Sequence, residues 1–385
     1  MKQNSTEEKT AFERRLSNLT DELYMRQALT LAKKGCGWVN PNPMVGAVIV
    51  KNGQIIGSGY HQKYGDLHAE RNALASCRES PKDATMYVTL EPCCHYGKTG
   101  PCTTAILQSG IRRVVIGSKD PNPLVCGKGI QELEKAGIQV TTGVLKEECN
   151  RLNTTFFHFI QTKTPYITMK YAMTLDGKIA AASGDSQWIT GEKARFHVHQ
   201  TRHQYSGIMI GVGTVLLDDP LLTCRLPESR NPVRIICDTA LRTPLTSRLV
   251  ATAREIPLIL ATCCTAPEKL LPYQQSGCQI LTLPSVDGHV DLRELCRRLG
   301  SQKIDSILLE GGTTLNWSAL NAGIVQNIQA YIAPKLLGGD KAKSPIGGEG
   351  VQNLSHAWKL APFSIKPLGE DLLLESEVLP CSQES

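Results

Sequence analysis

Two successive runs of alternating strand and helix patterns most strongly constrain how this 385-residue chain can fold. The first run opens with the short β-branched segment 44–50, and an Asn52-Gly53 turn leads it into a second strand. Asn-Gly between apolar runs is typical of a β-hairpin, and helix-connected strands follow it. We therefore expect an α/β fold with a mixed sheet in this part of the chain.

The alternation stops in a polar stretch that ends at Pro165, and it then restarts. A helix is expected over 20–34, and another precedes the polar stretch. Several strands of the second run are near-continuous apolar segments, as in sheets covered on both faces. We predict a polar N-terminal extension (1–19), a first domain (20–163) and a second α/β domain (164–385).

Composition and charge exclude several classes of protein. Lys and Arg number 42 against 36 Asp and Glu, and no run of five like charges occurs. Nucleic-acid and membrane surfaces need clustered charge, so neither partner is expected, whereas small anionic substrates fit. No apolar stretch reaches the roughly 18 residues of a membrane helix. The first residues are polar and lack the apolar region of a secretory signal, so we expect a cytoplasmic protein.

Most of the 14 cysteines stand singly in apolar surroundings, as small buried hydrophobes do, but Cys93, Cys94 and Cys102 lie within ten positions. Upstream, His68-Ala69-Glu70 opens an expected helix. H-x-E followed by P-C is the signature of zinc deaminases. Catalytic zinc takes three protein ligands and leaves a position for water, while a glutamate outside the ligand set moves the protons.

The spacing of the second thiol departs from the C-x-x-C of that signature. Position 96 is a tyrosine, and the next cysteine after Cys94 is Cys102. Adjacent cysteines point in different directions, so only one of Cys93 and Cys94 is expected to bind. Cys93 is favoured because it follows the proline. A chance cluster of buried cysteines and a core histidine is the competing interpretation.

The segments VNPNPMVGAVIV, HAE and EPCCHYGKTGPC resemble the bifunctional riboflavin-biosynthesis family, a pyrimidine deaminase fused to a reductase. That resemblance implies a cytidine-deaminase-like αβα domain in which the second thiol stands at the end of a longer loop. It implies zinc ligation by His68, Cys93 and Cys102, with Glu70 as the proton shuttle. It also implies that Asn42 and His95 contact the substrate.

The second half lacks the G-x-G-x-x-G fingerprint, because position 216 is a leucine after Gly211 and Gly213. A strand instead runs into the glycine-rich turn at 310–314 and then a helix, where backbone N–H groups favour a phosphate. This turn and three other segments, TLDGKIA, SGDSQWIT and GVGTVLLDDPLLTCR, resemble the reductase half of the same family.

The resemblance implies a dihydrofolate-reductase-like fold that uses NADPH. The implied cofactor contacts are Ala172, Trp188, Thr214, Asp218, Gly312, Thr313, Thr314, Leu315, Asn316, Trp317 and Ser318. The implied contacts with the ribosyl phosphate substrate are Ser186, Arg202, Leu222, Arg225 and Glu310. The planar guanidinium group of an arginine can donate two parallel hydrogen bonds to a phosphate, and a carboxylate accepts hydrogen bonds from sugar hydroxyls. Lys170 is a further candidate at this site, although no residue stands out as the proton donor.

The leading hypothesis is a two-activity enzyme of riboflavin biosynthesis. It deaminates 2,5-diamino-6-(5-phosphoribosylamino)pyrimidin-4-one with one zinc ion per chain and then reduces the ribosyl chain with NADPH. A homo-oligomer is expected. One alternative is a nucleic-acid-editing deaminase fused to a binding domain, which would need a basic or aromatic surface, whereas aromatic residues are 5%. Another is a structural zinc module, closed by Cys94 or His95 as a fourth ligand.

Overall fold

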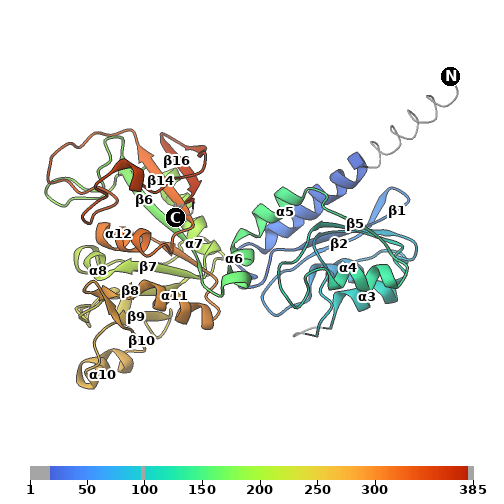
Figure 1. The fold of residues 1–385 in the computed structure, drawn as a ribbon, viewed down its shortest axis with the longest axis horizontal. Coiled ribbons are helices and arrows are strands. Elements are labelled where there is room, and N and C mark those ends of the chain that lie inside the picture. The colour runs from blue at the N-terminus through green and yellow to red at the C-terminus, as the bar shows by residue number, and fades with distance from the viewer. Residues whose placement is uncertain (1–17, 97–99, 380–385) are drawn as a thin grey trace. The chain divides into compact units, whose positions relative to one another are not determined.

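The computed structural model describes residues 18–96 and 100–379. Its contacts divide the chain into two compact units that meet between Thr162 and Lys163. Each unit is an α/β structure built on its own sheet (Figure 1). The α/β fold class predicted from the sequence is confirmed. Within the described residues, no helix is long and apolar enough to cross a membrane.

The first unit contains a five-stranded mixed sheet in the order β2-β1-β3-β4-β5. Its strands are β1 (Gly46–Lys51), β2 (Gln54–Tyr60), β3 (Thr85–Leu90), β4 (Arg113–Ser118) and β5 (Gln139–Thr142). The pair β1–β2 forms the predicted antiparallel hairpin, and β3, β4 and β5 run parallel. The carboxyl end of β3 therefore leads directly to the cysteine-rich loop.

Helices cover both faces of this sheet. They are a helix over 18–32, the turn η1 (Lys33–Gly35), α2 (Ala69–Ala75), α3 (Cys102–Ser109), α4 (Lys128–Lys135), α5 (Lys146–Leu152) and α6 (Thr154–Thr162). Alternate residues of β1 face opposite clusters: Ile49 packs with α2 and α3, and Val48 packs with the helix over 18–32. This alternation produces the expected αβα sandwich.

The single helix expected before the domain boundary is two helices. The chain breaks between α5 and α6 at Asn153, which has φ −115° and is 2% exposed. Its side chain accepts from the Met44 N–H (2.8 Å) and donates to the Met44 carbonyl (3.0 Å). Because this amide satisfies both backbone groups of a distant loop residue, helix termination here also positions the loop around Met44.

The second unit contains a nine-stranded sheet in the order β10-β9-β8-β7-β13-β6-β14-β16-β15. Its strands are β6 (Tyr166–Thr174), β7 (Gly207–Gly211), β8 (Val233–Cys237), β9 (Leu258–Thr262), β10 (Gln279–Thr282), β13 (Ser306–Leu309), β14 (Asn327–Ala333), β15 (Ser364–Leu368) and β16 (Asp371–Glu377). In this sheet order, the seven strands from β10 to β14 run parallel to one another. The last two strands, β16 and β15, pair antiparallel and form one edge of the sheet. A small hairpin, β11 (Ser285–Val286) with β12 (His289–Val290), lies outside this sheet.

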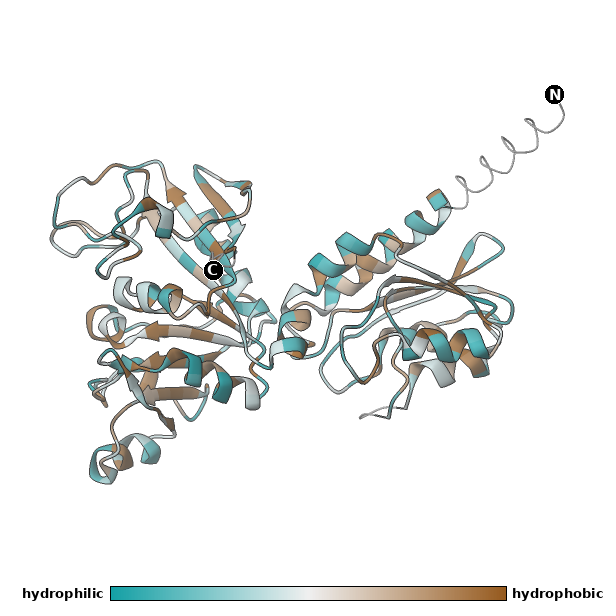
Figure 2. Cartoon of the chain, viewed as in Figure 1, coloured by the Kyte–Doolittle hydropathy of each residue, from teal (hydrophilic) through white to brown (hydrophobic). Residues whose placement is uncertain are grey.

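The helices of this unit bury both faces of its central strands. They are α7 (Glu192–Gln204), α8 (Val212–Asp218), α9 (Arg248–Ala251), α10 (Pro267–Gln275), α11 (Leu292–Ser301), α12 (Thr313–Asn321) and the turn η2 (Leu354–His356). Met209 and Ile208, neighbours on β7, belong to opposite clusters. Figure 2 shows these strands mostly at the hydrophobic end of the scale. The parallel strands direct their carboxyl ends to one edge, where polar loops gather.

Candidate active sites

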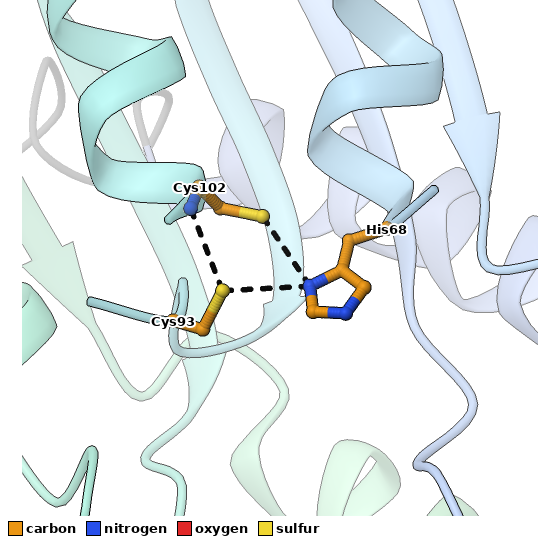
Figure 3. A group of neighbouring side chains, drawn as sticks. All are labelled: His68, Cys93 and Cys102. Atoms are coloured by element: carbon orange, nitrogen blue, oxygen red, sulfur yellow. Dashed lines mark hydrogen bonds between the residues drawn. The ribbon is translucent and has the colours of Figure 1, made fainter. Parts of the chain in front are cut away.

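His68, Cys93 and Cys102 come together in the first unit (Figure 3). The His68 Nδ1 atom lies 3.4 Å from each of the two sulfur atoms, and the three ligand atoms lie within 4.8 Å of one another. Tetrahedral zinc with ordinary bond lengths would place nitrogen and sulfur ligands about 3.6 Å apart. The donor set and its spacing therefore fit zinc.

Local backbone structure makes these three side chains converge. His68 precedes the first turn of α2 with extended dihedrals, φ −71° and ψ 162°, so it does not follow helical geometry. Cys102 is the first residue of α3, and its N–H donates to the Cys93 carbonyl at 3.0 Å. Arg71 donates to the carbonyls of Gly100 and Pro101, which holds the end of the cysteine loop.

Glu70 lies in the first turn of α2 and is 3% exposed. Burial, with a contribution from the Cys93 charge, raises the pKa of Glu70 to about 7. A carboxyl group with a pKa near neutrality both takes and gives protons at working pH. Two positions from a ligand and outside the His-Cys-Cys group, Glu70 suits proton transfer.

The two rival ligands do not join the cluster. The Cys94 thiol lies 3.8 Å from the Leu124 carbonyl, and Cys94 is outside the group formed by His68 and the other two cysteines. The His95 Nδ1 atom is buried with no hydrogen-bond partner among the described residues. An unsatisfied buried ring nitrogen is costly, and a polar ligand group would satisfy it.

Asn42 is held close to this site. Its side-chain Nδ2 lies 3.1 Å from the His61 Nε2, and the His61 ring lies 5.4 Å from the His68 ring. The Asn42 N–H also donates to the Val39 carbonyl at 2.8 Å. The fold thus brings Asn42 toward His68 although the two residues are 26 positions apart.

The second unit holds a cavity of about 960 Å³ at the carboxyl ends of its central strands. Residues following β7, β8 and β13 line it, together with β6 and α7. A crevice at that edge of a parallel sheet is where ligands bind in open α/β folds. Its size suits a dinucleotide together with a small substrate.

The glycine-rich turn forms one wall of the cavity. Gly311 and Gly312 have φ values of 92° and 97°, a region that favours glycine, and Gly312 is the N-cap of α12. The cavity lining includes Gly312, Thr313, Thr314, Leu315, Asn316 and Ser318. Trp317 is not part of the lining; its ring packs edge-on against Trp358 at 5.4 Å. Free N–H groups at this helix start offer a phosphate cradle.

A buried group of three charges lies at the end of β13. Arg202 donates from Nε (2.6 Å) and from its second terminal nitrogen (2.8 Å) to the Glu310 carboxylate, and Lys170 Nζ lies 3.7 Å from it. The other terminal nitrogen of Arg202 donates to the Thr223 carbonyl at 3.0 Å. Although burial opposes it, the charges of Arg202 and Lys170 lower the pKa of Glu310 to about 2.

The remaining predicted reductase residues fall into two groups. The cavity is lined by Ala172, Ser186, Trp188, Thr214, Asp218 and Arg225. Leu222 is 4% exposed and packs instead in the hydrophobic cluster beneath α8, α9 and α10. Its left-handed φ of 55° turns the chain just before Thr223, whose carbonyl holds Arg202.

Sequence reasoning missed several polar residues of the cavity wall: Thr239, Arg242, Lys341 and Lys343. Thr239 and Arg242 follow β8, and β7 separates β8 from β13 and Glu310. The lysines lie in the loop after β14. The one sequence signal for these four residues is that each follows a predicted strand, because scattered polar residues form no local motif.

Comparison with known proteins assigns both units. The RibD C-terminal domain family matches residues 165–374, and the cytidine and deoxycytidylate deaminase zinc-binding region matches 19–118. The riboflavin biosynthesis protein RibD of Actinobacillus pleuropneumoniae is 55% identical over 94% of this chain and 96% of its own length. That of Escherichia coli is 41% identical over 92% and 99%.

Solved structures agree with these relatives. One is a diaminohydroxyphosphoribosylaminopyrimidine deaminase/5-amino-6-(5-phosphoribosylamino)uracil reductase from Thermotoga maritima. It is 38% identical, with a TM-score of 0.83 over 94% of this chain and all of the other. RibD of Acinetobacter baumannii is 34% identical, with a TM-score of 0.85 over the same shares. The similarity spans both units.

Proposed function

The chain belongs to the RibD family and is a zinc-dependent deaminase and NADPH-dependent reductase of riboflavin biosynthesis. From this we propose which residues carry out each of the two reactions. Residues 20–163 carry the deaminase and 164–385 the reductase. The deaminase acts on 2,5-diamino-6-(5-phosphoribosylamino)pyrimidin-4-one, and the reductase converts the resulting ribosyl chain to ribityl. The convergence of His68, Cys93 and Cys102 is the observation that carries the deaminase assignment.

In the deaminase, His68, Cys93 and Cys102 would hold one zinc ion, which makes hydroxide available at neutral pH. Glu70 takes a proton from the attacking water and delivers protons to the ring nitrogen and the departing ammonia. Asn42 hydrogen-bonds the pyrimidine edge. His95, whose buried Nδ1 lacks a partner among the described residues, contacts the substrate.

In the reductase, NADPH supplies the hydride and the protein positions the reactants. The turn at Gly312 and the first residues of α12 hold cofactor phosphates with backbone N–H groups. Ala172, Trp188, Thr214 and Asp218 contact the rest of the cofactor.

The substrate lies against the charged group at the end of β13. Ionised Glu310 accepts from its sugar hydroxyls. Arg202 has five N–H donors, of which its contacts with Glu310 and Thr223 use three, so two remain for the substrate. Arg225 and Ser186, which both line the cavity, bind the phosphate, and Leu222 supports the turn before Thr223.

We propose further that the protein is a cytoplasmic homo-oligomer. All cysteines among the described residues are free thiols, as in a reducing compartment. Ile365 on the edge strand β15 is 63% exposed, and Phe363, directly before that strand, is 56% exposed, which supports association. Sedimentation velocity of the purified protein tests this, and a monomer at micromolar concentration would contradict it.

The decisive experiment incubates purified protein with the diaminopyrimidine substrate, with and without NADPH, and follows ammonia and NADPH separately. We expect ammonia release without NADPH, and NADPH oxidation only after deamination. Reduction without any ammonia release would contradict the proposed order. Ammonia release that survives complete zinc removal would contradict the metal site.

A further inference from the structure

The His61 imidazole lies buried next to both Asn42 and His68, and none of the roles above uses it. His61 directly follows β2, is 2% exposed, and donates its backbone N–H to the Val45 carbonyl at 2.9 Å. Its ring meets the His68 ring edge-on, with centroids 5.4 Å apart. Both of its ring nitrogens face polar atoms, so the contacts identify the tautomer.

The Nδ1 atom of His61 lies 3.0 Å from the Leu67 carbonyl oxygen. A carbonyl only accepts, so Nδ1 carries the hydrogen. The Asn42 Nδ2 lies 3.1 Å from the Nε2 atom. An amide nitrogen only donates, so Nε2 is the ring nitrogen without a hydrogen, and it accepts this bond.

This contact determines which way the Asn42 amide faces. A half-turn of the amide would place its oxygen against the Nε2 lone pair and bring two acceptors together. The backbone around Asn42 is already held, by its N–H bond to Val39 and by the Asn153 bonds to Met44. Among the described residues, the Asn42 oxygen has no hydrogen-bond partner.

We propose that His61 is a positioning residue of the deaminase, which holds the Asn42 amide with its oxygen free for an N–H donor of the pyrimidine. The proposal rests on the deaminase function proposed above. Its consequence is a chemical selection: the edge of the substrate that meets Asn42 presents an amino group or a protonated ring nitrogen. An edge with only acceptors would meet an oxygen and lose the bond.

The test measures ammonia release, bound zinc and reductase activity in three variants. His61→Phe keeps the ring and its packing on His68 but removes both nitrogens. We expect its deaminase kcat/KM to fall about 10-fold, mostly through KM, because one hydrogen bond and the amide orientation are lost. His61→Gln, which retains a donor and an acceptor, recovers part of that loss. Zinc content and reductase activity stay at the wild-type level in both.

Asn72→Ala is the matched control. The Asn72 amide donates to the same Leu67 carbonyl (3.2 Å) and to Tyr60 (2.9 Å), without touching Asn42. If His61 acts through Asn42, this variant stays within about twofold of wild type. A loss equal to that of His61→Phe would mean that His61 only supports the Leu67 backbone, which would overturn the proposal.

A double-mutant cycle identifies the partner through which His61 acts. In an Asn42→Ala background, His61→Phe should cause no further loss, because the amide that it orients is gone. Additive losses, or zinc loss in His61→Phe alone, would overturn the proposal. If wild type releases no ammonia, the proposed function fails; if wild type does and His61→Phe matches it, only this inference fails.

Discussion

The zinc cluster and the reductase cavity hold their chemical groups in opposite ways. In the cluster, a histidine and two cysteines contact mainly one another, with Nδ1 to sulfur distances of 3.4 Å. In the cavity, Glu310 is already bonded twice by Arg202 and faces Lys170. The cluster is thus a donor set suited to a metal, whereas the charges of Arg202, Lys170 and Glu310 in the cavity pair with one another within the protein.

Because of this difference, substitutions in the zinc cluster should mainly affect activity, whereas substitutions in the buried ion pair of the cavity should also affect stability. Replacement of a zinc ligand should therefore act mainly through loss of the bound metal and of the chemistry that it supplies. A buried ion pair with one partner removed leaves an unpaired charge, which destabilises the domain. The following predictions test the contrast, from the largest effect to the smallest.

Cys102→Ser should abolish both zinc binding and ammonia release, because it removes one of three ligands. Cys94→Ser should retain both, since the Cys94 thiol lies near the Leu124 carbonyl and outside the cluster. Metal analysis of the purified variants and an ammonia assay check this. Zinc loss in Cys94→Ser together with zinc retention in Cys93→Ser would reverse the ligand assignment.

Glu70→Gln should retain zinc and lower the deaminase rate by about 10²- to 10⁴-fold, the usual contribution of a general acid–base group. Reduction of pre-deaminated substrate should be unchanged, because the cavity residues all belong to the second unit. If this variant also stopped NADPH oxidation with that substrate, the two-site description would be wrong.

Arg202→Ala should destabilise the second unit by about 3–5 kcal/mol, since Glu310 would stay buried without its bidentate partner. Urea unfolding followed by tryptophan fluorescence reports this, because three of the four tryptophans lie in that unit. Arg202→Met combined with Glu310→Gln should recover much of the loss. If Arg202→Ala were as stable as wild type, the Arg202–Glu310 ion pair would not contribute to the stability of the second unit.

Arg225→Ala should lower reductase kcat/KM about 10- to 150-fold, because a charge-assisted hydrogen bond contributes roughly 1.5–3 kcal/mol. NADPH affinity should change far less, and Arg225→Lys should recover only part of the loss. A variant that loses its preference for NADPH over NADH, yet handles the substrate normally, would place Arg225 at the cofactor.

Acid should weaken the second unit through Glu310. Its folded pKa of about 2 lies below the ordinary 4.5, so its contribution to stability is present above pH 4.5 and is lost as the pH falls toward 2. Exposed Asp176, whose pKa is also lowered to about 2, titrates in the same window. The comparison is therefore the pH slope of the urea midpoint in wild type against Glu310→Gln; identical slopes would contradict the Glu310 contribution.

The sequence by itself determined the α/β class, the riboflavin-pathway family and the candidates for the zinc site. His68 and Cys102 are only 34 positions apart, and the residues between them form one helix, one strand and the loop that carries the cysteines. Metal ligands are also of few residue types and recur at narrow spacings, so a sequence motif is enough to predict the zinc ligands. The glycine turn at 311–312 is similarly local, because positive φ favours glycine.

Only the tertiary structure decided which side chains satisfy one another. Arg202 and Glu310 are 108 positions apart, and nothing in either segment marks the other as its partner. The same is true of His61 with Asn42, and of Trp317, which turns from the cavity toward Trp358. Hydrogen bonds and ion pairs require atoms of distant segments to lie about 3 Å apart, within a few tenths of an ångström. Those distances exist only once the sheet that carries both segments has formed.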